Sequence, residues 1–242
     1  MSAQIRDAQD AAPGANLSTT HTKMELQRRR GRPRTFDRSV VLGRAMRVFW
    51  SRGYEGTSIA DLLQAMRVTP PSLYSAFGSK ERLFLEALDH YGRVEGAGTD
   101  QTLWEAATAR EAIENMLRRN ADAYTRPGEP CGCMVLVCAT VGTPVNPAVR
   151  ERLSQVSAQA HANVQHRLDA AVASGELPAA TDTVGMTAFY MTVLQGMSLQ
   201  ARTGASRAAL HGIVDAAMRA WESWCCPPRV TTSRRAAGET PS

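Results

Sequence analysis

The sequence predicts an all-α chain with a small helix-turn-helix domain followed by a larger helical domain. Three observations lead to this fold class. Apolar residues recur at helical spacing from Val41 to Trp221, and no segment alternates as a half-buried strand would. Two short helices separated by a few residues are expected between residues 57 and 77. The positive charge is concentrated in the first third of the chain.

The charge distribution indicates that only one part of the chain meets a polyanion. Residues 1–80 contain 13 Lys and Arg against 6 Asp and Glu, whereas residues 81–242 contain 15 against 17. A basic excess confined to one domain is the electrostatic signature of nucleic-acid binding. The net charge of +5 over 242 residues conceals this asymmetry.

Composition excludes several classes of protein. With 43% hydrophobic and 21% charged residues, the chain is neither a disordered polyelectrolyte nor a fibre. The longest apolar stretch, Cys133 to Val141, is far shorter than the roughly 20 residues of a membrane-spanning helix, and residues 1–10 lack a signal-peptide core. Five irregularly spaced cysteines favour a cytoplasmic protein over a disulfide framework. No cofactor or enzyme motif is present.

The chain divides into five expected segments. Residues 1–27 are predicted to be a disordered leader, within which Met24 is an alternative start, and residues 227–242 a disordered tail. A basic arm follows at 28–35, a helix-turn-helix domain at 36–95, and a helical domain at 100–226. The segment Gly96-Ala97-Gly98 is the expected boundary between the two domains. On its own, the basic arm is also compatible with a solvated tail.

Capping residues and apolar stripes predict four helices in the first domain. Thr35 or Asp37 caps the first, which ends at Gly53, and Thr57 or Ser58 caps the second. A short helix from Pro70 to about Ala76 and a longer one from Ser79 to about Val94 complete the domain. The expected helices of the second domain are 106–124, 133–140, 146–174, 181–202 and 206–224.

The segment from Phe36 to Leu88 resembles the DNA-binding domain of the TetR family of transcriptional regulators. The resemblance rests on two segments, FWSRGYEGTSIADL at 49–62 and PSLYSAFGSKERLF at 71–84. The first contains the family's phenylalanine, its Gly-aromatic pair and its Thr-Ser pair. The second contains the Leu-Tyr pair of a short recognition helix and the Ser-Lys pair that opens the next helix. The match is about fifty residues long and has no gap. It implies an all-α, homodimeric repressor that binds a palindromic double-stranded DNA operator and releases it when a small-molecule inducer binds.

The resemblance also implies DNA contacts at Thr57, Ser72, Tyr74 and Lys80. Small or polar side chains on a recognition helix can approach base edges in the major groove, so Thr69, Ser75 and Ala76 are expected neighbours of the bases. Arginines in an extended arm fit a narrow A·T minor groove, which assigns this role to Arg32 and Arg34. The alternatives are that Thr57 is only a cap, Tyr74 only core, and Lys80 only a solvated charge.

Cys133 is a candidate sensor. The Gly-Cys followed by an apolar stretch resembles the helix start of NemR-like members of the family, in some of which this cysteine reacts with electrophiles. A helix N-terminus favours the thiolate, and Cys131 could act as a resolving partner. The alternative is a small buried apolar residue. A rival function is a thiol-based redox protein that uses Cys131 and Cys133, with DNA binding secondary.

The second domain carries the remaining predictions. An apolar ligand pocket is expected to be lined by Met116, Leu117, Tyr124, Met134, Phe189 and Tyr190, although each is also compatible with plain core. By resemblance, dimerisation through the last two helices would use Val193, Met197, Leu210, Val214, Ala217 and Trp221. No metal site is predicted, because His161 and His166 are five residues apart and do not share a helix face. Cys225 and Cys226 are interpreted as an inert helix end.

Overall fold

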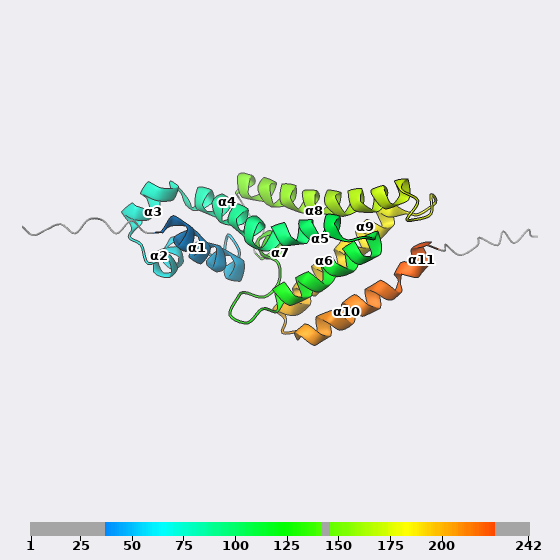
Figure 1. Ribbon diagram of the computed structural model, residues 1–242. Coiled ribbons are helices and arrows are strands. Elements are labelled where there is room, and N and C mark those ends of the chain that lie inside the picture. The colour runs from blue at the N-terminus through cyan, green and yellow to red at the C-terminus, as the bar shows by residue number, and fades with distance from the viewer. Residues whose placement is uncertain (1–36, 142–145, 226–242) are drawn as a thin grey trace, which may run out of the picture. The chain divides into compact units, whose positions relative to one another are not determined.

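The computed structural model describes residues 37–141 and 146–225, and within these ranges the regular structure is entirely helical. The predicted all-α fold class is confirmed. The leader, the basic arm with Arg32 and Arg34, the C-terminal tail and Cys226 lie outside the described residues. The elements, shown in Figure 1, are α1 (Arg38–Arg52), α2 (Ile59–Met66), α3 (Pro70–Phe77), α4 (Lys80–Tyr91), η1 (Gly92–Gly96), α5 (Ala97–Glu105), α6 (Ala109–Tyr124), α7 (Met134–Thr140), α8 (Pro147–Ala173), α9 (Thr183–Arg202), α10 (Arg207–Arg219) and α11 (Trp221–Cys225).

Side-chain caps set the starts of the first two helices. The Asp37 carboxylate accepts hydrogen bonds from the amides of Ser39 and Val40 and caps α1. Ser58 and Asp61 form a reciprocal capping box at the start of α2, in which each side chain binds the other's backbone N–H. The sequence left two candidates for each cap, and the structure selects Asp37 and Ser58.

Apolar contacts hold α3 against α4, and α4 against α1. Leu73 and Phe77 are the buried residues of α3, while Leu83 and Phe84 of α4 are completely buried. The Phe84 ring packs edge-on against Phe49, with 5.1 Å between ring centroids. These contacts fix the orientation of the short α3, which is too short to be stable in isolation.

The segment Gly96-Ala97-Gly98, where the sequence predicted the domain boundary, lies within continuous helix. The backbone stays helical from α4 through the π-helical turn η1 into α5, and Gly96 itself has helical torsion angles. The sequence therefore missed α5, and α6 begins at Ala109 behind a Thr108 cap, three residues later than predicted. Two glycines in three residues were interpreted as a linker, but neighbouring contacts of α5 with α6 and α8 override their low helix propensity.

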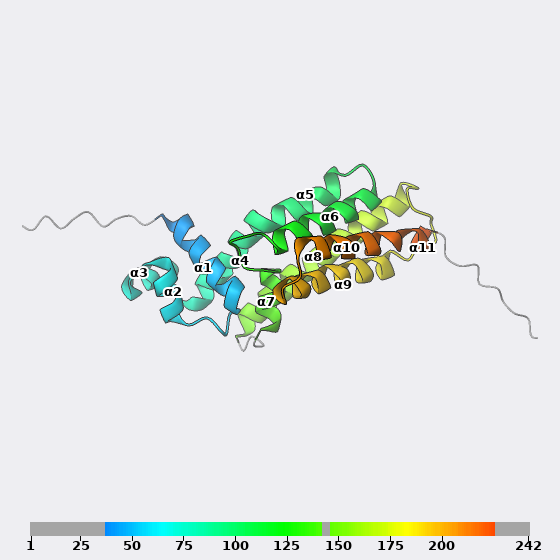
Figure 2. The same ribbon diagram turned by 90° about the horizontal axis from the view of Figure 1, so that it is seen from below.

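Two apolar cores run through the described residues, and their division differs from the predicted domains. One core joins α1–α4 to α7 and the N-terminal half of α8, so Met134, Val137 and Leu153 pack with the helix-turn-helix residues. The other core lies among α5, α6, α9, α10 and α11, with part of α8. Figure 2 shows α7 beside α1. The first four helices thus share a core with helices that the sequence assigned to the second domain.

A tight turn at residues 131–133, hereafter the Gly132 turn, joins three helices. The indole N–H of Trp50 on α1 donates a buried hydrogen bond to the Gly132 carbonyl, with 2.9 Å between the two atoms. The next amide, that of Cys133, donates to the hydroxyl of Ser198 on α9 at 2.8 Å. Gly132 has φ +80°, and a Cβ there would lie 2.7 Å from the Ser198 carbonyl oxygen. Only glycine fits this close approach without strain.

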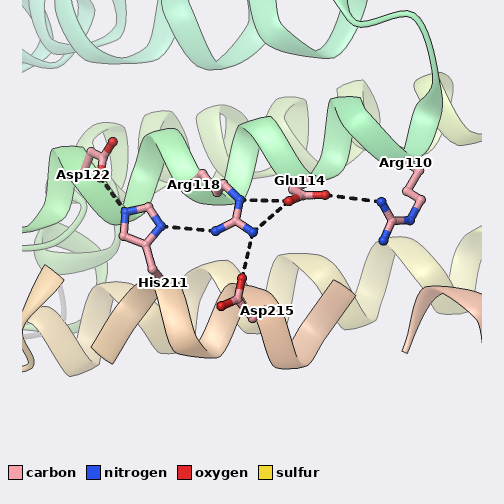
Figure 3. Close-up of polar contacts among 6 residues, drawn as sticks. All are labelled: Arg110, Glu114, Arg118, Asp122, His211 and Asp215. Atoms are coloured by element: carbon pink, nitrogen blue, oxygen red, sulfur yellow. Dashed lines mark hydrogen bonds and ion pairs between the residues drawn. The ribbon is translucent and has the colours of Figure 1, made fainter. Parts of the chain in front are cut away.

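Charged side chains join α10 to α6 on the outside of the second core. Figure 3 shows Arg118 of α6 between Glu114 and Asp215, at 2.8 and 2.7 Å, and His211 of α10 against Asp122 at 2.7 Å. These groups are partly exposed, so each pair adds little to stability by itself. They nevertheless fix the register of α10 along α6.

Candidate nucleic-acid interface and ligand pocket

The outer face of α3 carries most of the predicted DNA-contacting side chains. Pro70 and Pro71 occupy the first helical turn, where a missing N–H leaves no hydrogen bond unmade. Thr69, Tyr74 and Ser75 are exposed, and Ser72 is partly exposed. Because Leu73 and Phe77 face the core, these small and polar side chains face solvent on the opposite side of the helix. A short helix with such a face can enter a major groove.

Two hydroxyls at the start of α3 are paired with each other. Thr69 is the N-cap residue, but its side chain makes no capping bond, and its hydroxyl lies 2.9 Å from that of Ser72. The helix N-terminus therefore keeps backbone donors that no side chain of the cap satisfies. Hydroxyls in this position can exchange their mutual bond for one to a base edge or a phosphate.

Lys80 opens α4 next to the same surface. Its ammonium lies 4.3 Å from the centre of the Tyr54 ring, within cation–π range. Partial burial lowers the Lys80 pKa from its usual value, and the nearby Glu55 carboxylate opposes that shift. The ring holds the charge at the N-terminus of α4, where the helix dipole also favours an anion such as phosphate.

Thr57 does not belong to this surface, which corrects the predicted contact. Its side chain is 1% exposed, and its hydroxyl donates to the Gly53 carbonyl at 2.7 Å. The buried hydroxyl thus closes the turn between α1 and α2. The neighbouring Ser58 caps α2, and it is the residue of the Thr-Ser pair that is exposed to solvent. Burial of one of two adjacent hydroxyls cannot be deduced from sequence spacing.

An apolar cavity of about 360 Å³ lies among α7, α8 and α9, and its lining differs from the predicted one. Of the predicted pocket residues only Tyr124 lines it. Met116, Leu117, Met134 and Tyr190 are fully buried core, and the Phe189 ring packs on Tyr190 and Trp224. The lining residues that the sequence missed are Val135, Leu136, Ala139, Arg150, Leu153, Ser154, Val156, Ser157, Ala160, Met191, Leu194, Gln195 and Ser198. Six of these thirteen residues lie on α8, on which the sequence predicted no pocket residue.

Cys133 lines this cavity at the start of α7, where it is the N-cap residue and is partly buried. Two buried tyrosines, Tyr91 and Tyr124, contact its side chain. Burial raises the pKa of both phenols well above the usual value, and interaction with Cys133 adds to the shift. Both hydroxyls are therefore protonated at neutral pH and are available to donate to a sulfur or to a ligand. Cys131 is an exposed free thiol on the same turn.

The predicted dimerisation residues are mostly interior, which is a further correction. Met197, Leu210, Val214, Ala217 and Trp221 are at most 5% exposed because they pack inside the chain, and Val193 is partly buried. The large apolar stripes of α9 and α10 thus face the core of their own subunit. The solvent-facing sides instead carry small or isolated apolar residues, which include Val184, Ala188, Gly196 and Leu199 on α9 and Ala209, Gly212 and Ala216 on α10.

Helices α1–α4 and the polar face of α3 define a helix-turn-helix DNA-binding protein. Residues 41–87 match the N-terminal domain described as bacterial regulatory proteins, tetR family, and residues 109–220 match a tetracyclin repressor-like C-terminal domain. The chain is 34% identical over 197 residues to the HTH-type transcriptional repressor ComR of Escherichia coli, a match that spans 81% of this chain and 94% of ComR. The chain belongs to the TetR family, whose members are DNA-binding transcriptional regulators and not enzymes.

Solved structures agree with this assignment. A cysteine-substituted variant of the TetR family regulator CifR, complexed with 26-bp double-strand operator DNA, is 45% identical with a TM-score of 0.75, and the match covers 78% of this chain and all of that one. Reduced NemR of Escherichia coli is 17% identical, covers 73% of this chain and 92% of that one, and has a TM-score of 0.61. The NemR likeness shows the fold alone, so the sensor assignment of Cys133 stays a prediction.

Two kinds of feature are absent from the described residues, a metal-binding cluster and a helix that could cross a membrane. In residues 37–141 and 146–225, no group of three or more His, Cys, Asp and Glu side chains is placed to hold a metal ion. Within the same ranges, no helix combines the length and apolarity needed to cross a membrane.

Replacing Lys80 by Met tests the DNA-facing surface. The variant keeps a side chain of similar length at this position but loses the charge beside the Tyr54 ring, so the affinity for duplex DNA should fall about tenfold near 0.1 M salt. The plot of log K against log[salt] has a negative slope, and this slope should become shallower by about 0.9 for each Lys80 lost. Fluorescence anisotropy across a salt series measures both. Arg119→Met, at an exposed site on α6, is the charge-matched control, and an equal effect in both variants would contradict the assignment.

Proposed function

We propose that this protein is a ligand-responsive transcriptional repressor that binds a palindromic operator as a homodimer. The polar outer face of α3, with Lys80 beside it, is the observation that carries the DNA-binding half of the proposal. The named functions of ComR and CifR support repression and operator binding. The basic arm at 28–35 adds Arg32 and Arg34 as minor-groove contacts in this proposal.

The inducer site of the proposal is the cavity among α7, α8 and α9. Its lining is apolar apart from a few groups such as Cys133, Arg150 and Gln195, which favours a small, mainly apolar molecule. Cys133 gives the site a nucleophile. Cys138 is not expected to react with an electrophile, because burial raises the pKa of its thiol to about 12 and its S–H donates a hydrogen bond to the Phe49 carbonyl. An electrophilic inducer that enters the cavity would therefore react at Cys133, which lines it, whereas exposed Cys131 is not part of the lining.

The proposed signal travels through the Gly132 turn. A group bound at Cys133 or Ser198 acts on the two residues whose backbone and hydroxyl fix this turn. The Gly132 carbonyl also holds the Trp50 indole, so a displacement of the turn would move α1 and the helices packed on α1. For release to follow, the inducer must bind the DNA-incompetent arrangement more tightly than the competent one.

The homodimer of the proposal uses the outer faces of α9 and α10. These two helices pack side by side, as Figure 2 shows, and their exposed glycines and alanines permit close approach of a second pair of helices. Open space surrounds Gly196 and Gly212, so neither glycine is needed for packing within the subunit. A two-fold dimer presents two recognition helices to half-sites separated by one or more turns of DNA.

Cys133→Ser tests the response to an electrophile, with N-ethylmaleimide as the probe. Sulfur bonds to one alkene carbon and the thiol proton ends on the other, so no oxidant or leaving group is needed. We expect the wild type to lose at least tenfold in DNA affinity after modification, and the variant to bind normally and resist release. Cys138→Ser is the control and should still be released. Release of the Cys133→Ser variant to the same extent as the wild type would refute the sensor role, whereas an adduct at exposed Cys131 is expected in both proteins.

Gly212→Gln tests the dimer. Glutamine has a better helix propensity than glycine, by roughly 0.5–1 kcal/mol, so the subunit should not lose stability. Its side chain should nevertheless obstruct the close approach of a partner helix. Light scattering after size exclusion should give twice the chain mass of 26.2 kDa for the wild type and a single chain mass for the variant. Gly92→Gln, at another open helical glycine, should remain dimeric. A dimeric Gly212→Gln would place the interface elsewhere.

A further inference from the structure

Arg67 occupies a backbone conformation that side chains normally avoid. Among the described residues it is the one non-glycine residue with positive φ, at φ 57° and ψ 45°. It caps the C-terminus of α2, and its amide donates to the Leu63 carbonyl, so the way α2 ends fixes these torsion angles. Glycine is the usual residue in this position because Cβ crowds the following carbonyl in the left-handed region. The left-handed conformation of Arg67 is therefore strained relative to glycine, and it singles this residue out among the described ones.

Capping of α2 is not the role of the Arg67 side chain. A cation near the end of a helix can satisfy its last carbonyl groups, but the Met66 carbonyl already accepts a hydrogen bond from Arg44, with 3.3 Å between the atoms. The Arg67 side chain itself is exposed, and within the described ranges it has neither a hydrogen bond nor an ion pair. Its guanidinium is free to bind something outside the subunit.

The position of Arg67 identifies that binding partner. Arg67 lies in the turn between α2 and α3, two residues before Thr69, the N-cap of α3. In a helix-turn-helix the first residues of the recognition helix meet the base edges, while the preceding helix crosses the sugar-phosphate backbone. The turn that joins them therefore lies at the rim of the major groove. A guanidinium there faces phosphates, to which it can donate two parallel hydrogen bonds.

We propose that Arg67 is a DNA phosphate contact, and that the left-handed strain at this position is retained because arginine adds a charged anchor just before the recognition helix. Strained backbone held by the surrounding structure is commonly found at functional sites. This inference rests on the proposed operator binding. It adds a residue that neither periodicity nor the family resemblance singled out, because only the torsion angles distinguish Arg67 from other exposed arginines.

The experiment compares Arg67→Gly, Arg67→Asn and Arg67→Lys on one duplex, selected from a random-sequence pool by the wild-type protein. Gly and Asn tolerate the left-handed region but carry no charge, whereas Lys keeps the charge. Arg67→Gly and Arg67→Asn should each reduce DNA affinity about tenfold per subunit near 0.1 M salt. Each should also make the negative slope of log K against log[salt] shallower by about 0.9 per subunit. Arg67→Lys should keep the wild-type slope of log K against log[salt]. Arg119→Asn, which removes an exposed charge from α6, should change neither quantity.

Stability provides the second measurement. Arg67→Gly relieves the strain, so its melting temperature should be equal to or above that of the wild type, which separates loss of a contact from loss of the fold. Reduced affinity with a retained melting temperature supports the proposal. Unchanged affinity and slope in Arg67→Gly, or an equal loss of slope in Arg67→Lys, would overturn it. If the wild type selects no duplex, operator binding itself fails, a result distinct from an unchanged Arg67→Gly variant.

Discussion

The Gly132 turn is the constraint on which the arrangement of the two cores depends. Its carbonyl accepts from Trp50 of α1, and the adjacent amide of Cys133 donates to Ser198 of α9, so one turn anchors the DNA-binding helices to the helices around the cavity. Each hydrogen bond contributes only about 0.5–1.5 kcal/mol net. Leaving the buried indole donor unpaired would cost about 1–3 kcal/mol. Energies of this size match the 1–3 kcal/mol over which coupling between two sites usually operates.

Ion pairs reinforce this junction without replacing it. Glu129, just before the turn, forms two 2.7 Å hydrogen bonds with Arg47 of α1, and this contact lowers the pKa of the Glu129 carboxyl. Arg126 binds Glu95 in the π-helical turn between α4 and α5. The connection after α6 is therefore held to α1 and to η1 by exposed or partly exposed charges. Such pairs orient the segment, while the buried bonds of Trp50 and Ser198 define its position.

Sequence reasoning was strongest where function requires a local pattern. Capping rules narrowed the starts of α1 and α2 to two residues each, which included Asp37 and Ser58, and backbone rules predicted the proline-led α3. It failed where tertiary contacts decide. A stripe of large apolar residues such as Leu210 and Trp221 indicates burial but not whether the partner is another subunit or α6 of the same chain. The cavity was missed because its lining comes mainly from three helices, α7, α8 and α9, and no local motif marks residues that only tertiary packing brings together. Thr57 was misassigned because its side chain is buried, whereas that of the adjacent Ser58 is exposed.

If the Gly132 turn couples the cavity to the DNA-binding helices, as we propose, Trp50→Phe should weaken that coupling. Phenylalanine keeps the aromatic packing but removes the N–H that binds Gly132. DNA affinity is measured before and after complete modification of Cys133 by N-ethylmaleimide, with the extent of modification checked by mass spectrometry. We expect the wild type to lose at least tenfold in DNA affinity and Trp50→Phe to lose about twofold or less. An equal loss in both proteins, at equal modification, would contradict the proposed coupling.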